Sequence, residues 1–251
     1  MRRIAAVAAL ILGVIGLVVS AAGLVIAVLP RHFSAGQQKA IMDWEVSGRW
    51  RELPAGKIFP STVGYTLPGT VVAQDPPLVL RAVRVTIAPQ TRCDAGVSGA
   101  AAAGLLNRDG CETMLRATYV DQTMSFVMTV AVAVLPSSGA ASAASGRLSG
   151  TQLAPVLDAS EIGTGVRTVR YTGADGALYD YSKQVSATLA AGPYLVLYAA
   201  GYADGRPRVP LANDSYSQAE ITSLAHGVAT TVADSLGSAP APPHCPGSPG
   251  C

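Results

Sequence analysis

An apolar run near the N-terminus is the feature that most constrains how this chain can fold. Over residues 4–29 there are 26 consecutive positions, and every residue among them except three glycines and one serine is apolar. At about 1.5 Å of rise per residue, a helix over this run reaches about 39 Å, which is enough to cross the hydrocarbon core of a bilayer. The sequence therefore predicts a transmembrane anchor over residues 4–29.

The charges that flank this run predict its orientation. Arg2 and Arg3 come directly before it, and basic residues beside a first span hold that end of the chain in the cytoplasm. We therefore expect residues 1–3 to be a cytoplasmic stub and the rest of the chain to lie on the extracytoplasmic side of the cell membrane. A cleavable signal peptide is the alternative, because residues 20–22 are small, although the apolar run is longer than a usual signal-peptide core.

Beyond the anchor, the composition is that of a folded domain with balanced charge. The whole chain is 49% hydrophobic, and without the anchor the apolar share falls to about 45%, an ordinary value for a globular protein. Once Arg2 and Arg3 are set aside, the basic residues number 16 and so do the acidic ones. This balance gives no electrostatic support to nucleic-acid binding, and the apolar content argues against general disorder.

The cysteines predict disulfides in an oxidising compartment. The chain has 4 cysteines, Cys93, Cys111, Cys245 and Cys251, all far beyond the anchor. Three connectivities are open, and loop closure favours the two local pairs, Cys93 with Cys111 and Cys245 with Cys251. A zinc site is the alternative, but zinc-binding cysteines are usually two to four residues apart, and neither pair has that spacing.

Composition divides the rest of the chain into three segments. Residues 30–57 are expected to form a juxtamembrane linker, in which Trp44 and Trp50 either lie at the membrane surface or pack into the domain. Residues 58–237 are expected to form one extracytoplasmic domain. Residues 238–251 are rich in proline and are expected to be a disordered tail.

Hydrophobic patterning predicts an α+β domain with a mainly antiparallel sheet covered by helices. Strands are predicted at residues 78–88, 114–120, 125–135, 163–171, 182–189 and 193–202, and helices at 94–109, 138–148 and 215–236. The last helix carries an apolar stripe at helical spacing, made of Ile221, Leu224, Ala225, Val228, Val232 and Leu236. Runs of neighbouring strands between helices favour a sheet with helices on one face.

Four features together resemble a known group of proteins. They are Cys93 with the alanine-rich segment after it, GCETMLRATYVD at residues 110–121, TVAVAVLPS at 129–137 and AAGYADGR at 199–206. In these features the chain is similar to uncharacterised single-pass, membrane-anchored extracytoplasmic proteins of actinobacteria, over roughly residues 78–206. The resemblance implies a location and a compact domain, and it brings no assigned activity.

Few residues in the sequence predict catalysis. There are 3 histidines, His32, His226 and His244, and only His226, with Asp214, could belong to a serine triad. No nucleophile-elbow motif accompanies them, and His226 falls away from the apolar stripe, so a solvated position is expected.

The acidic residues and the glycine motifs do not add a predicted site. Asp94, Asp109, Glu112 and Asp121 lie near one another in sequence, but their spacing matches no calcium loop, and we expect them at the surface. No phosphate-binding glycine motif is present. The sequence thus predicts no catalytic residue, no metal and no cofactor.

These observations favour a non-enzymatic interaction or accessory module of the bacterial cell envelope. Its membrane contact is residues 4–29, its expected partner is another envelope or membrane protein, and the oligomeric state is left open. The alternative is an envelope hydrolase or a small-ligand-binding domain with an unrecognised site. An exposed apolar patch would favour the module, whereas a cleft with converging polar groups would favour the alternatives.

Overall fold

The computed structural model describes residues 34–68, 77–152, 165–169, 183–206 and 215–240. Asp43–Pro240 form one compact unit, which contains the fold described below. Among the described helices, none is both long and apolar enough to cross a membrane. The predicted anchor at residues 4–29 lies outside the described residues, and so does the tail from residue 241 onward.

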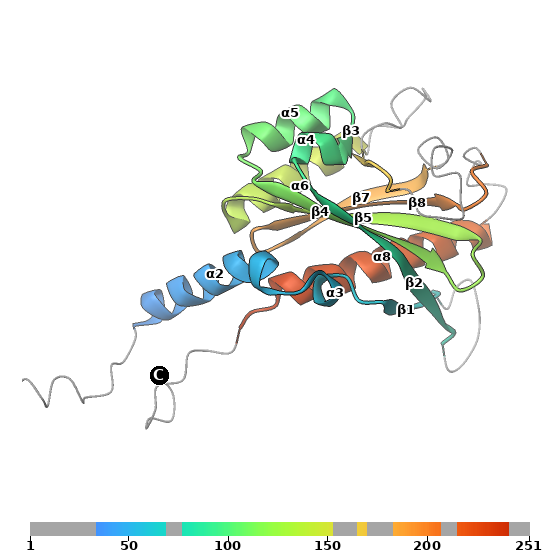
Figure 1. The fold of residues 1–251 in the computed structure, drawn as a ribbon, viewed down its shortest axis with the longest axis horizontal. Helices are drawn as coiled ribbons and strands as arrows, with labels where there is room; N and C mark the ends of the chain where they lie inside the picture. Colours follow the sequence, from blue (N-terminus) through green and yellow to red (C-terminus); the bar gives the residue numbers. More distant parts are fainter. Residues whose placement is uncertain (1–33, 69–76, 153–164, 170–182, 207–214, 241–251) are drawn as a thin grey trace, which may run out of the picture. The chain divides into compact units, whose positions relative to one another are not determined.

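A six-stranded antiparallel sheet forms the centre of this unit, with strand order β1-β2-β4-β5-β8-β7 (Figure 1). The strands of this sheet are β1 Thr62–Thr66, β2 Val79–Thr91, β4 Thr113–Asp121, β5 Phe126–Val134, β7 Lys183–Ala191 and β8 Tyr194–Tyr202. A second, two-stranded sheet pairs β3 Val97–Ser98 with β6 Gly165–Val166. The described helices are α2 Ala35–Glu52, α3 Ala55–Ile58, α4 Cys93–Gly96, α5 Ala100–Arg108, α6 Ser138–Gln152 and α8 Ser215–Gly237. The predicted α+β class and antiparallel sheet are confirmed.

Two inner strands of the sheet, β5 and β8, are buried on both sides. Successive side chains of a strand point to opposite faces, so Met128, Val130 and Val132 of β5 join the core on one face of the sheet. Ala131 and Ala133 join the core on the other face. Burial on both faces explains why these strands are almost continuously apolar in sequence instead of alternating with polar residues.

Helix α8 covers the first of these faces through the predicted stripe. Ile221, Leu224 and Val228 are fully buried in the core beneath the sheet. The approach is close, because a Cβ atom added at Gly227 would lie 2.8 Å from Cβ of Tyr65 on β1. The prediction that this helix packs its apolar stripe on the sheet is therefore confirmed.

The opposite face is covered as well, which corrects the expectation of helices on one face only. Helices α4, α5 and α6 lie on this side in Figure 1. Ala141 and Ala144 of α6 belong to the same core as Ala199 of β8. Small residues on both elements allow α6 to approach the sheet closely. The expectation failed because the hydrophobic pattern of a strand does not show which element covers its second face. Gly99, with φ of 95°, separates α4 from α5, where the sequence had predicted one helix.

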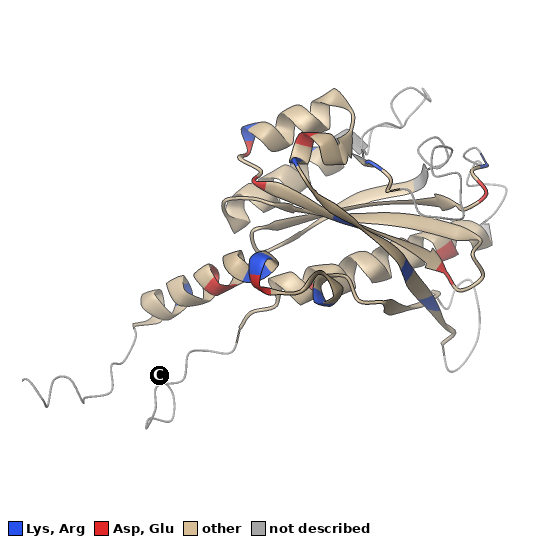
Figure 2. Cartoon of the chain, viewed as in Figure 1, with Lys and Arg blue, Asp and Glu red and all other residues tan. Residues whose placement is uncertain are grey.

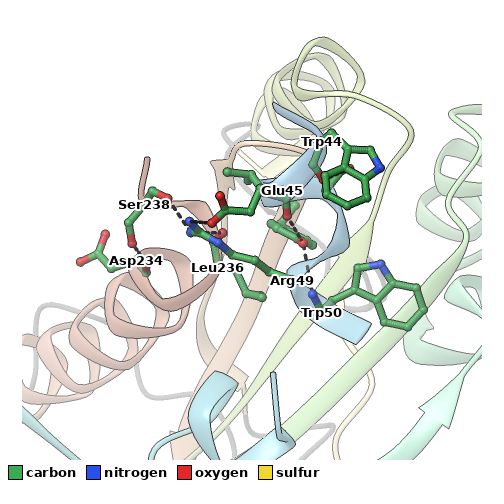
Figure 3. A network of polar contacts seen from close by, with 10 residues as sticks. Trp44, Glu45, Arg49, Trp50, Asp234, Leu236 and Ser238 are labelled. Carbon is green, nitrogen blue, oxygen red and sulfur yellow. Dashed lines mark hydrogen bonds and ion pairs between the residues drawn. The ribbon is translucent and has the colours of Figure 1, made fainter. Parts of the chain in front are cut away.

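The second half of α2 belongs to the compact unit, although residues 30–57 were expected to be a linker. The guanidinium of Arg49 donates a 3.1 Å hydrogen bond to the carbonyl oxygen of Leu236 and another to that of Ser238, and it pairs with Glu45 at 3.3 Å (Figure 3). A cationic side chain on these terminal carbonyls stabilises the C-terminal end of α8.

A buried tyrosine makes a second attachment of α2 to the sheet. The hydroxyl of Tyr194 on β8 donates to the carbonyl oxygen of Val46 and accepts a 3.3 Å hydrogen bond from the backbone N–H of Trp50. Trp50 packs against the core, whereas Trp44 is 73% exposed. The two tryptophans therefore differ: only Trp50 packs into the domain.

Candidate interaction surface

The disulfide predicted between Cys93 and Cys111 is present. It joins the first residue of α4 to the segment that leads into β4, with the Cα atoms 6.2 Å apart. Cys93 is buried in the core of the second sheet face. The bond therefore fixes the small helices over that face, which is a structural role. Cys245 and Cys251 lie outside the described residues, so their pairing stays a prediction.

The histidine that the sequence singled out is exposed. His226 lies on the solvent side of α8, as expected for a solvated residue. Its conceivable triad partner Asp214 lies outside the described residues, and so do His32 and His244. The described residues therefore bring no serine triad together around His226.

Three of the four sequence-neighbouring acidic residues form separate ion pairs. Asp94 pairs with Arg92, Asp109 with Arg147 and Glu112 with Arg51. The hydrogen bond from Arg92 holds the pKa of the Asp94 carboxyl below its usual value. In the part of the chain that the structure describes, no group of three or more candidate metal ligands is found.

Asp121 is the exception, because it is buried rather than at the surface as expected. Only 1% of this residue is exposed. One carboxylate oxygen accepts a 2.6 Å hydrogen bond from the backbone N–H of Phe126, and the other accepts from the backbone N–H of Thr123 at 2.7 Å and from its hydroxyl. Asp121 therefore holds the turn between β4 and β5, which contains Met124 at φ of 59°.

A second carboxyl lies in the electrostatic range of Asp121. Burial, and then the charge of Asp121, raise the pKa of Glu220 on α8. The hydroxyl of Tyr65 donates a 3.4 Å hydrogen bond to Glu220, and burial raises the pKa of this tyrosine as well. Because both oxygens of Asp121 already accept hydrogen bonds within the turn, this pair of carboxyls is better explained by the fold than by acid–base chemistry.

An exposed surface lies on β1 and β2, on the face that points away from α8. It is called the β1–β2 face here and consists of Thr62, Gly64, Thr66, Val79, Arg81 and Val83. Its members are direct cross-strand partners, Thr62 with Val83, Gly64 with Arg81 and Thr66 with Val79, so they project to the same side. The residues between them, such as Val63 and Ala82, are buried on the α8 side.

This face combines apolar side chains with one positive charge. Val79 is 61% exposed and Val83 is 41% exposed, and Val85, next along β2, is exposed too. Arg81 is exposed, and among the described residues no carboxylate pairs with it. Figure 2 shows basic but no acidic residues along β2, and neither β1 nor β2 contains an acidic residue.

The β1–β2 face ends at the outer strand of the sheet, whose outward edge pairs with no other described strand. β1 is the outer strand of the sheet, and the carbonyl oxygen of Ser61 accepts a 2.9 Å hydrogen bond from the backbone N–H of Arg84 on β2. Backbone groups of an antiparallel strand alternate in direction, so those of Thr62, Gly64 and Thr66 point away from β2. No described group makes a hydrogen bond with these outward backbone groups.

Sequence reasoning missed this surface because it missed β1. The alternation in Thr62–Thr66 is a strand signal, but it spans only five residues and has a glycine at its centre. The strand at residues 78–88 was predicted, yet its valines could not be assigned to a buried or an exposed face without the position of β2 in the sheet. Burial of Leu80 and Ala82 and exposure of Val79 and Val83 follow only from the packing of α8.

Comparison of the chain with protein-family models, with curated proteins and with solved structures finds no match. No activity, ligand or partner can therefore be transferred from a relative. Among the described residues, the β1–β2 face is an exposed surface that combines apolar side chains with a positive charge.

Proposed function

We propose that this protein is a non-enzymatic interaction or accessory module of the bacterial cell envelope. In this proposal residues 4–29 anchor it in the cell membrane, with residues 1–3 in the cytoplasm and the domain on the extracytoplasmic side. The domain binds another envelope protein through the β1–β2 face. The observation that carries the proposal is the exposure of Val79 and Val83 on one side of the sheet, beside Arg81, with which no described carboxylate pairs.

Single exposed apolar residues are common on proteins and need no explanation. Here, however, the exposed valines occupy alternate positions of one strand, and the neighbouring strand adds only threonines and a glycine on that side. The result is a surface on which apolar side chains lie beside small ones and a single charge. Helices cover other parts of the same sheet on both faces (Figure 1), and on the β1–β2 face a partner would complete the burial.

The chemistry of Arg81 specifies the kind of partner. An exposed guanidinium without a carboxylate partner attracts an acidic group, and apolar side chains beside it contribute most when the partner excludes water from them. The partner is therefore expected to be a protein surface that is apolar and carries at least one carboxylate. A balanced total charge beyond the anchor supports a protein partner over a nucleic acid.

The structure favours this function over the hydrolase alternative. A hydrolase would need free carboxylates or a serine site in a cleft, whereas Asp94, Asp109 and Glu112 are held in ion pairs and Asp121 in a turn. The exposed apolar surface is the observation that distinguishes the two, and it favours the interaction module.

Site-specific crosslinking in the cells that produce the protein tests the proposal. The photoreactive residue p-benzoylphenylalanine is placed at Val83, with Thr222, an exposed residue of α8, as the matched control position. We expect one discrete protein adduct from position 83 and none of the same mass from position 222. The adduct should disappear when Val79→Asp, a change at another exposed position, is added.

The partner is then identified by mass spectrometry, and its binding is repeated with the two purified proteins. If positions 83 and 222 give the same adducts, or if Val79→Asp leaves the position 83 adduct unchanged, the β1–β2 face is not the binding surface.

A further inference from the structure

We propose that the partner binds by β-strand addition. An extended segment of the partner pairs with the open edge of β1, and its carboxylate forms an ion pair with Arg81 across Gly64. This inference rests on the proposed function, because it specifies how the β1–β2 face is occupied. It goes further in naming the backbone conformation of the partner and the position of its charge.

The backbone of β1 is the first reason. The outward N–H and C=O groups of Thr62, Gly64 and Thr66 have no described hydrogen-bond partner. These groups repeat at strand spacing, and a segment in extended conformation is the structure that can satisfy them in series. An incoming strand would also continue the sheet, so alternate side chains of the partner would lie beside Thr62 and Thr66 of β1, one strand away from the exposed valines of β2.

The second reason is that this edge lacks the features that normally discourage pairing. Edge strands are usually protected by lysine, proline, charged side chains or a β-bulge. The opposite edge strand, β7, contains Lys183 and has a register shift between Lys183 and Val185. β1 has the sequence TVGYT, which is uncharged, and its register with β2 is regular throughout. The two edges of the same sheet thus differ, because β1 carries neither of the devices found in β7.

Gly64 is the third reason, because the fold itself does not require a glycine there. Its φ is not in the left-handed region, and a Cβ atom at this position would lie 3.7 Å from Cγ1 of Val79, which is an ordinary contact. A glycine inside a strand weakens the strand and often marks the close approach of another group. Here it removes the one side chain that would stand between Arg81 and the residue of an incoming strand.

Geometry and charge then define the residue that faces Gly64. Neighbouring strands are about 4.8 Å apart, so the incoming residue would have its Cα atom about 10 Å from that of Arg81, within reach of an arginine and an acidic side chain together. An aspartate or glutamate at this position would give Arg81 the carboxylate that it lacks among the described residues. Residues two positions to either side would lie beside Thr62 and Thr66, and apolar side chains there would extend the apolar surface of Val79 and Val83.

Charge argues against a second copy of this chain as the occupant. Pairing of β1 with β1 of another copy would place both Arg81 side chains on the same face, and neither β1 nor β2 supplies an acidic residue to compensate them. The proposal therefore commits to a different protein with an acidic, extended segment.

Binding of designed peptides to the full chain, purified in detergent, tests the inference. The probe is the fluorescently labelled peptide KTVTETVTK, whose alternate residues present valine, glutamate and valine on one side. The control peptide is KTVTKTVTK, in which lysine replaces the glutamate. Fluorescence anisotropy measures affinity, and hydrogen–deuterium exchange of the full chain locates the bound peptide.

We expect the glutamate peptide to bind about tenfold more tightly than the lysine peptide, and Arg81→Glu to reverse this preference. Arg108→Glu, at another exposed arginine, is the charge-matched control and should leave the preference unchanged. Gly64→Pro removes an outward N–H and should abolish binding. Gly64→Ala keeps that N–H and should retain binding, with a smaller preference for the glutamate peptide because its Cβ atom lies between Arg81 and the glutamate. Circular dichroism verifies that each variant is folded. If Gly64→Pro does not fold, the peptide preference of Arg81→Glu tests the inference.

The glutamate peptide should also protect the amides of residues 62–66 from exchange. Equal affinity for the two peptides, a preference that Arg81→Glu does not change, or no binding at all would overturn the inference. Protection of residues 62–66 without peptide, together with a dimer in analytical ultracentrifugation, would show that a second copy occupies the edge. A crosslinked partner at position 83 that gives no protection at residues 62–66 would overturn strand addition alone and leave the proposed function standing.

Discussion

Truncation of Val83 and of Leu224 should have very different effects, because the two side chains lie on opposite sides of the sheet. Leu224 is fully buried between α8 and the sheet, among neighbours that are themselves buried. Leu224→Ala leaves a cavity that this tightly packed core cannot fill, so we expect a loss of about 3–5 kcal/mol in the free energy of unfolding. For a domain of this size, such a loss lowers the melting temperature by about 10 °C.

Val83 is 41% exposed on the β1–β2 face, and Val83→Ala removes two methyl groups that are already partly hydrated. We therefore expect a loss below about 1 kcal/mol. His226→Ala, at an exposed position of α8, is the control for Leu224→Ala and should change stability by less than about 0.5 kcal/mol.

Urea unfolding of the full chain, followed by circular dichroism, measures all three variants under the same conditions. If Leu224→Ala leaves the unfolding midpoint unchanged, α8 does not pack on the sheet as described. If Val83→Ala is as costly as Leu224→Ala, the β1–β2 face is covered within the chain itself, and the proposed binding surface is wrong.

Three further predictions concern the carboxyls and the disulfide. Burial raises the pKa of Glu220, so the folded state favours the protonated carboxyl, and the stability that this gives is present at low pH and lost as the pH rises through the raised pKa. Glu220→Gln should therefore stabilise the protein at neutral pH, by a margin that shrinks as the pH falls toward about 4. A margin that does not depend on pH in urea titrations would contradict this prediction. Asp121→Ala leaves the backbone N–H groups of Thr123 and of the buried Phe126 without their carboxylate partner, and it should cost about 2–4 kcal/mol in unfolding free energy. A cost near zero would show that the turn does not depend on this carboxylate. Replacing Cys93 and Cys111 together by serine should cost about 3 kcal/mol, measured against the oxidised wild type, and the reduced wild type should show the same loss if the bond is its cause.

Several parts of the fold could be predicted from sequence because local pattern decides them. The stripe of α8 repeats at helical spacing from Ile221 to Leu236, and its docking followed from that repeat. The Cys93–Cys111 bond followed from short loop closure. Strands β4 and β5 were predicted as an antiparallel pair because a short turn separates them.

Other parts depend on contacts between residues far apart in the chain. Arg49 reaches the carbonyl oxygen of Leu236, 187 positions later, and this contact brings part of the expected linker into the compact unit. Asp121 was expected at the surface because aspartates usually are, and only the backbone N–H groups of the β4–β5 turn make its burial favourable.

The β1–β2 face separates what local sequence predicts from what depends on tertiary structure. The sequence by itself determined that β2 is a strand with valine and arginine at alternate positions. Only the tertiary structure decided that β1 forms the edge beside it, that α8 covers Leu80 and Ala82, and that Val79 and Val83 stay exposed. The physical reason is that periodicity reports which side chains share a face, whereas exposure depends on which distant segment packs on that face.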